Sequence, residues 1–102
     1  MARVVVSLLA QADTAIILAD LAEKAGRGVA AEYAAAFEAV YERLAAHPDS
    51  GPPRSALGRD IRIGVVSLYI IIYGRTEAND TVTIFRVVHG RRRITGKLPR
   101  RG

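Results

Sequence analysis

The residue types best suited to chemistry gather near one end of the sequence. The stretch FRVVHGRRRITG, residues 85–96, closes a β-branched apolar run with His89 and then, after one glycine, carries three consecutive arginines. Histidine can move protons because its ordinary pKa is about 6.5, and arginine can hold a phosphate or a developing negative charge. The stretch therefore suits acid/base chemistry on a phosphodiester, electrostatic binding of an acidic partner, or simply a soluble end to a sheet.

Cleavage of RNA without a metal requires a base for the ribose 2′-hydroxyl, a cation for the charge on phosphorus and an acid for the leaving oxygen. The residues that could supply these functions are Arg62, Arg86, His89 and Arg92. Regular strand alternation separates two faces, with Val82, Ile84, Arg86 and Val88 on one and Thr83, Phe85, Val87 and His89 on the other. Arg86 and His89 can therefore converge only if the strand bulges near Gly90. The structural alternative for His89 is a hydrogen bond between its ring and a backbone carbonyl at the strand end.

Two arginines lie inside apolar stretches and need an explanation. Arg86 follows Phe85 in a β-branched run, and an arginine is rarely buried without a partner. It either binds a target, reaches water past the sheet edge, or pairs with a glutamate of a helix. Arg62 lies between Ile61 and Ile63, and its simplest interpretation is a position on the solvent face while its neighbours point inward.

Charge is distributed unevenly along the chain of 102 residues. Residues 1–53 carry four basic and seven acidic side chains, whereas residues 54–102 carry eleven basic and three acidic ones, so the balances are −3 and +8. The last twelve positions contain six basic residues and no acidic one. This asymmetry indicates that the second half faces an anionic partner such as a nucleic acid or an acidic protein, although a basic solvated surface is the commoner reason for a charge run.

The composition argues against several classes of protein. The chain contains no cysteine and only two histidines, His47 and His89, so we expect neither a disulfide scaffold nor a metal site, and no cofactor. No apolar run reaches the roughly 18 residues of a membrane span, and no Gly-rich phosphate loop is present. We expect one cytoplasmic domain over residues 1–102, with a basic tail at about 97–102.

The first half is typical of a strand followed by two helices. The segment ARVVVS is short and β-branched, and Ser7 is suited to cap the helix that follows. The first helix is predicted up to a break near Gly26 by a stripe of Leu9, Ala12, Ile16 and Ala19. The second helix, which ends before Pro48, is predicted by a stripe of Tyr33, Phe37, Val40, Tyr41 and Leu44. A Gly-Arg-Gly link then makes the two helices an antiparallel hairpin whose apolar stripes must be covered.

The second half is typical of a β-meander. A proline-rich loop, HPDSGPPRSALGRD, leads to three runs, IRIGVVS, LYIIIYGRT and TVTIFRVVH, with the turn residues EAND between the last two. The middle run is apolar from Leu68 to Tyr73, which predicts an inner strand covered on both faces or nearly so. The predicted fold class is α+β: an N-terminal strand added beside a three-stranded antiparallel meander, with the helix hairpin on one face and a single core.

Three segments resemble a known family. They are the loop with Pro48, Gly51 and Pro53 that leads to Ile61-Arg62, the strand YIIIYGR that contains Tyr73, and the run RVVHGRRRI. In this order and spacing the chain resembles, over nearly its whole length, the ParE branch of the ParE/RelE toxins of type II toxin–antitoxin systems, a group that includes plasmid stabilisation proteins. Three residues depart from the family pattern. Gly64 stands where the family usually has a bulkier residue, Leu68 where it usually has a polar or basic one, and Arg93 where it usually has an acidic one.

The resemblance implies a function and partners. ParE-like members are associated with inhibition of DNA gyrase, whereas RelE-like members cut messenger RNA on the ribosome, and a cognate antitoxin neutralises the toxin. We predict a non-catalytic inhibitor of gyrase that forms a hetero-oligomer with a ParD-like or other antitoxin. The alternative is a ribosome-dependent endoribonuclease that uses the four residues named above. The lack of a lysine cluster or a C-terminal tyrosine that could serve as a base favours binding.

Two binding surfaces follow from this interpretation. The predicted target-binding residues are Arg86, His89, Arg91, Arg92, Arg93 and Lys97. The segment LYIIIY is apolar beyond what one covered face needs, which predicts an exposed apolar groove for an antitoxin helix or strand. The predicted antitoxin-binding residues are Leu68, Tyr69, Ile71, Tyr73, Tyr33 and Phe37.

Overall fold

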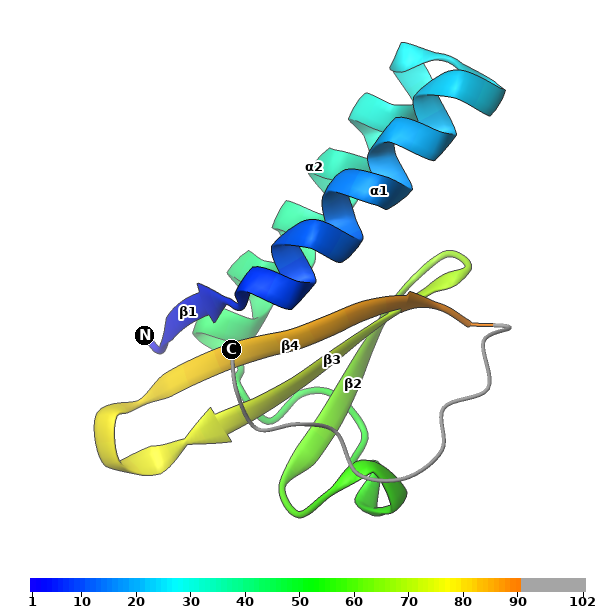
Figure 1. Cartoon of the computed structure of the whole chain (residues 1–102). Coiled ribbons are helices and arrows are strands. Elements are labelled where there is room, and N and C mark those ends of the chain that lie inside the picture. The colour runs from blue at the N-terminus through cyan, green and yellow to red at the C-terminus, as the bar shows by residue number, and fades with distance from the viewer. Residues whose placement is uncertain (91–102) are drawn as a thin grey trace.

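A computed structural model describes residues 1–90 of the chain. The elements follow one another as β1 (Arg3–Val6), α1 (Leu8–Ala25), α2 (Arg27–Ala46), β2 (Ile61–Val66), β3 (Tyr69–Thr76) and β4 (Thr81–His89), with short 3-10 turns at Ser55–Leu57 and Glu77–Asn79. Figure 1 shows the two helices lying side by side as a hairpin on one face of the sheet. The predicted order of strand, helix, helix and three strands is therefore confirmed.

The sheet is mixed, because β1 joins it in parallel. Its strand order is β1-β4-β3-β2; β1 pairs with β4 in parallel, and the β4-β3 and β3-β2 pairs are antiparallel. The inner position predicted for the apolar middle run is confirmed, since Ile71, Ile72 and Tyr73 of β3 are completely buried. Consecutive residues of a strand point to opposite faces, so β3 must be covered on both.

Capping explains where the first helix begins. The Ser7 hydroxyl accepts a hydrogen bond from the Ala10 amide at 3.0 Å and donates one to the Phe85 carbonyl of β4 at 3.0 Å. Ser7 thus satisfies the start of α1 and ties it to the sheet. The link between the helices is shorter than the predicted Gly-Arg-Gly, because Gly26 alone separates them and reverses the chain with a φ of 98°, a conformation that favours glycine.

The inward face of α1 differs from the predicted stripe. Leu9 and Ile16 are 45% and 69% exposed, and Ala12 and Ala19 are exposed as well. The residues that pack on the core are instead Ala10, Ile17, Leu18 and Leu21. The prediction was wrong because α1 carries apolar residues on two faces, so helical spacing alone cannot choose between them. The stripe of α2 is confirmed: Phe37, Val40 and Leu44 are buried, and Tyr33 and Tyr41 are half-buried.

Within residues 1–90 the buried apolar residues form two clusters rather than the single predicted core. One cluster lies between the helices and the sheet and includes Phe37, Tyr73 and Ile84. The other contains Leu57, Ile61, Ile63, Ile72, Phe85 and Val88. The strands contribute alternate residues to the two clusters. The long apolar run of β3 is therefore buried on both faces of the sheet.

A bulge in β4 changes which residues share a face. The register pairs Tyr73 with Ile84 and Ile72 with Arg86, so Phe85 is an extra residue in β4. Gly74 of β3 makes room for the Phe85 side chain, because a Cβ at that position would lie 2.9 Å from the Phe85 ring. The predicted alternation is therefore wrong beyond Ile84: Val87 joins Val82 and Ile84 in the cluster beneath the helices, whereas Phe85 and Val88 belong to the opposite cluster.

Candidate functional site

The end of β4 is held by an aromatic cluster. The Tyr69 ring makes edge contacts with His89, Tyr33 and Phe37, at centroid distances of 5.4, 5.6 and 6.0 Å. The Tyr33 hydroxyl donates a hydrogen bond to the Ser67 hydroxyl at 3.1 Å, and burial is the main cause that raises the pKa of Tyr69. His89 therefore packs against the ring of its cross-strand partner, Tyr69, two residues before the basic run of the sequence begins.

The β2–β3 hairpin fixes the backbone at the same end of the sheet. The Gly90 amide donates a hydrogen bond to the Leu68 carbonyl at 2.6 Å, while the Leu68 side chain is 55% exposed. Arg91, Arg92, Arg93 and Lys97, which complete the predicted target-binding set, lie outside the described residues. The described members of the predicted target-binding set are thus Arg86 and His89, whereas the exposed Leu68 belongs to the predicted antitoxin-binding set.

Arg86 is engaged within the chain. Its Nε and one terminal nitrogen donate to the two carboxylate oxygens of Asp13 at 2.7 and 2.9 Å, and the Val87 amide donates to Asp13 at 3.0 Å. The Asp13 carboxylate raises the pKa of Arg86, chiefly through these hydrogen bonds. Of the alternatives open from the sequence, pairing with a helix carboxylate describes this geometry, with an aspartate of α1 in place of a glutamate. A target-binding role for Arg86 remains a prediction.

Arg62 braces the proline-rich loop. It donates a hydrogen bond to the Gly51 carbonyl at 2.7 Å and lies 3.8 Å from the Asp49 carboxylate. The buried Tyr73 hydroxyl accepts a hydrogen bond from the Gly51 amide at 2.9 Å. The proline-rich loop and the strand with Tyr73, two of the segments that carry the family resemblance, therefore contact each other. Arg62 is part of this contact, whereas the sequence suggested a place on the solvent face.

The three described candidates for a nuclease do not come together. Arg62 lies opposite Tyr73, and His89 lies opposite Tyr69, four residues away and thus about 13 Å along β3. Arg86 lies opposite Ile72, a residue of the cluster on the other face. Arg92 is outside the described residues. Within residues 1–90, no arrangement of a proton-transfer group and two arginines around one phosphate is formed, and no group of three or more metal-ligating side chains gathers.

The predicted antitoxin-binding residues divide into buried and accessible ones. Phe37, Ile71 and Tyr73 are at most 1% exposed, and Tyr69 is also buried. The predicted apolar groove along β3 is wrong in this respect, because both faces of that strand are covered. Only Tyr33 and Leu68 offer surface to a partner. The large apolar side chains that are exposed on a helix lie instead on α1, where they are Leu8, Leu9 and Ile16.

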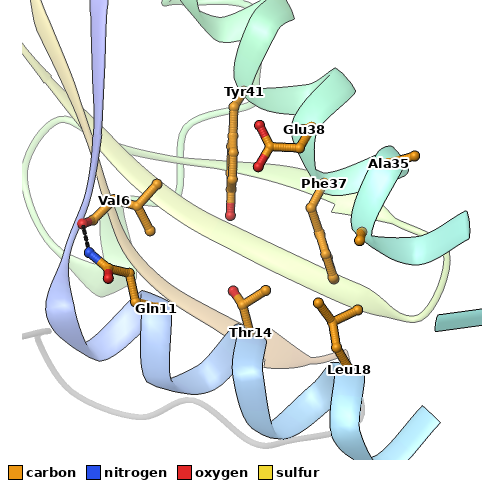
Figure 2. Close-up of a pocket in the computed structure, with 9 residues that line it drawn as sticks. Val6, Gln11, Thr14, Leu18, Ala35, Phe37, Glu38 and Tyr41 are labelled. Atoms are coloured by element: carbon orange, nitrogen blue, oxygen red, sulfur yellow. Dashed lines mark hydrogen bonds between the residues drawn. The ribbon is translucent and has the colours of Figure 1, made fainter. Parts of the chain in front are cut away.

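Sequence reasoning missed a groove between the two helices. It has a volume of about 580 Å³. Residues from three elements line it: Val6 of β1, Gln11, Thr14 and Leu18 of α1, and Ala34, Ala35, Phe37, Glu38 and Tyr41 of α2. Figure 2 shows Tyr41 and Thr14 pointing toward each other across it. The one signal in the sequence was a tyrosine within an apolar stripe, since a buried phenol needs a hydrogen-bond partner.

The Tyr41 hydroxyl is a buried polar atom that forms no hydrogen bond with the described residues. The neighbouring Thr14 hydroxyl donates to the Ala10 carbonyl at 2.8 Å. Burial raises the pKa of Tyr41, the nearby Thr14 hydroxyl opposes that rise, and the charge of Glu38 adds to it.

Neither helix of the described chain combines the length and apolarity that a membrane crossing requires. The family model for the ParE toxin of the type II toxin–antitoxin system parDE matches residues 4–94. The chain therefore belongs to the ParE toxin family.

Solved structures with the same fold include two from toxin–antitoxin systems. A structure of the chromosomal ParDE system from P. aeruginosa has 15% identity and a TM-score of 0.73, and the match covers 87% of this chain and 96% of that one. A structure of the RelBE2 toxin–antitoxin complex from Mycobacterium tuberculosis has 21% identity and a TM-score of 0.62, with 86% and 96% covered. No curated sequence matches significantly.

Proposed function

We propose that this ParE-type toxin inhibits DNA gyrase by binding to it, without turnover, and that a cognate antitoxin neutralises it. The observation that carries the proposal is the separation of Arg62, Arg86 and His89, because a nuclease without a metal needs such groups around one phosphate. Two of the three are also committed to contacts within the chain, Arg62 with the Gly51 carbonyl and Arg86 with Asp13.

The proposed interacting surface is the exit of β4 together with the basic sequence that follows it. The aromatic contact between Tyr69 and His89 packs the end of β4, and six basic residues follow in the sequence from position 91 onward without an acidic one. Such a concentration of positive charge favours association with an acidic surface or with the DNA that gyrase holds.

The experiment is controlled expression of the chain in growing bacteria. Gyrase inhibition predicts growth arrest with filamentous cells and a DNA-damage response while protein synthesis continues at first. Co-expression of the antitoxin from the adjacent reading frame should restore growth. Immediate loss of translation with cut messenger RNA would contradict the proposal and identify a ribosome-dependent endoribonuclease.

A further inference from the structure

The side of α1 that faces away from the core is apolar. Its large side chains, Leu8, Leu9 and Ile16, are 75%, 45% and 69% exposed. In the sequence from Leu8 to Ala19 the one charged residue is Asp13, and it is turned toward β4, where it accepts hydrogen bonds from Arg86. A surface helix normally carries polar residues opposite its core face. We call this surface the outer face of α1, and its exposed members are Leu8, Leu9, Ala12, Ala15, Ile16 and Ala19.

The outer face is centred on Ala12. The residues three and four positions before it are leucines, and those three and four positions after it are Ala15 and Ile16, so both pairs lie one helical turn from the centre. A second α1 packed antiparallel about a two-fold axis at Ala12 therefore places the two central alanines against each other and the leucines of one copy beside Ala15 and Ile16 of the other. The small central side chain allows the two helices to approach to about 8 to 10 Å, the usual interaxial distance.

Charge favours a second copy over an acidic partner at this face. The chain has a net charge of +5, but the residues of the outer face carry none of it, so two copies can meet there without bringing like charges into contact. The next charged residues along the helix, Asp20 and Lys24, pair with each other at 3.0 Å and lie about 12 Å or more from the two-fold axis. An acidic surface or a nucleic acid would find no cation to bind on this face.

We infer that the chain binds a second copy of itself through the outer face of α1, as an antiparallel helix pair with Ala12 on the two-fold axis. Apolar patches of this kind measure about 300 to 600 Å² on a soluble protein, so two copies bury about 1,000 Å², the lower limit for a specific interface. The dimer is therefore weak, with an expected dissociation constant of roughly 10 to 100 µM. Its formation requires neither the target nor the antitoxin.

Sedimentation equilibrium of the purified chain at concentrations from about 5 to 500 µM tests the dimer. Ala12→Glu places two carboxylates at the axis, whereas the matched control, Ala31→Glu, adds the same charge at an exposed position of α2. Wild type and Ala31→Glu should dimerise with dissociation constants within about twofold of each other, and Ala12→Glu should raise the constant about tenfold or more. A monomer over the whole range, a series of species larger than a dimer, or equal effects of the two variants would overturn the inference.

A cysteine variant tests the register of the helix pair and does not rely on the folding of Ala12→Glu. The chain has no cysteine of its own, so a single introduced cysteine reports one contact. A disulfide needs two Cα atoms about 4.4 to 6.8 Å apart, a condition that the proposed dimer meets at Ala12 and not at Ala31. Under mild oxidation at about 100 µM, Ala12→Cys should form a covalent dimer about ten times faster than Ala31→Cys or more. Equal rates for the two variants, or a dimer in sedimentation that Ala12→Cys does not cross-link, would overturn the pairing of the two outer faces.

Discussion

At the scale of single residues, polar side chains that the sequence suggested for function form contacts within the fold. Arg86 and Arg62 are the best examples, since each occurs within an apolar strand sequence and each is held by an intramolecular acceptor. The sequence predicts that such an arginine needs a partner but cannot name it. The Asp13 partner is 73 positions away from Arg86, and only the packing of α1 on β4 brings the two together.

Loss of the Asp13 carboxylate should destabilise the chain markedly. Asp13→Ala leaves Arg86 and the Val87 amide without their acceptor at a site where the two side chains are only 16% and 24% exposed. We expect the free energy of unfolding to fall by about 2 to 3 kcal/mol, measured by urea denaturation. The control is Asp20→Ala on the same helix, which breaks only the exposed pair with Lys24 and should leave the transition unchanged. Similar effects of the two variants would contradict the structural role of Asp13.

Tyr41 should make the stability depend on pH in the alkaline range. Burial raises the pKa of Tyr41 in the folded chain above its ordinary value of about 10, so the folded state favours the neutral phenol. Its contribution is fully present below pH about 10 and is lost as the pH rises through the raised folded pKa. The free energy of unfolding of the wild type should therefore fall more steeply above that pH than that of Tyr41→Phe. Superimposable pH profiles would contradict a buried Tyr41 hydroxyl.

At the scale of elements, the sequence predicted the number, type and order of the helices and strands, and the helix stripe of α2, because each has one clear periodicity. It could not predict the inward face of α1 or the bulge at Phe85. The first failure reflects apolar residues on two faces of one helix. The second depends on Gly74, a residue of the neighbouring strand, which makes room for the Phe85 ring. Both are decided by contacts between elements that lie apart in the chain.

The proline-rich loop and the helix hairpin offer two glycines with opposite expected effects. A Cβ at Gly51 would collide with the Ile63 carbonyl and the Tyr73 hydroxyl, so Gly51→Ala should displace the loop and lower the free energy of unfolding by about 2 kcal/mol. Gly28 lies within α2, and no atom lies near the position that a Cβ would take. Gly28→Ala should therefore raise the free energy of unfolding by about 0.5 to 1 kcal/mol. Thermal unfolding of the two variants shows whether each change lowers or raises the stability of the chain. A neutral Gly51→Ala would show that the loop is not held as described.

At the scale of the whole molecule, our account assigns most of the target-binding charge to the sequence that follows β4, whereas the described residues form the packed fold. The described residues bury two apolar clusters and pair Arg62, Arg75 and Arg86 with internal acceptors. The basic residues from Arg91 onward lie outside the described residues, and in our account their charge contributes to target binding. The candidate site could be predicted from sequence as a concentration of charge after β4, whereas its aromatic support and the α1–α2 groove depend on residues that tertiary packing brings together.

Two variants distinguish inhibition through the positive charge of the arginines from inhibition through proton transfer by His89. Replacing Arg91, Arg92 and Arg93 by glutamine should reduce inhibition about tenfold or more, because it removes three positive charges that we assign to target binding. His89→Gln retains hydrogen-bonding capacity without titrating near neutral pH and should stay within about twofold of wild type. Dose-dependent growth inhibition measures both, with circular dichroism as the control for folding. A catalytic His89 would reverse this order, with a loss of about a hundredfold from the single change.

The most direct test of the central claim is a DNA supercoiling assay in which purified chain is titrated into gyrase. Our account predicts that inhibition is complete near a stoichiometric ratio of chain to gyrase, does not increase with incubation time as turnover would require, and is relieved by the antitoxin. The same preparation should leave ribosome-bound messenger RNA intact. Fully active gyrase in the presence of excess chain, together with cleavage of that messenger RNA, would contradict the claim.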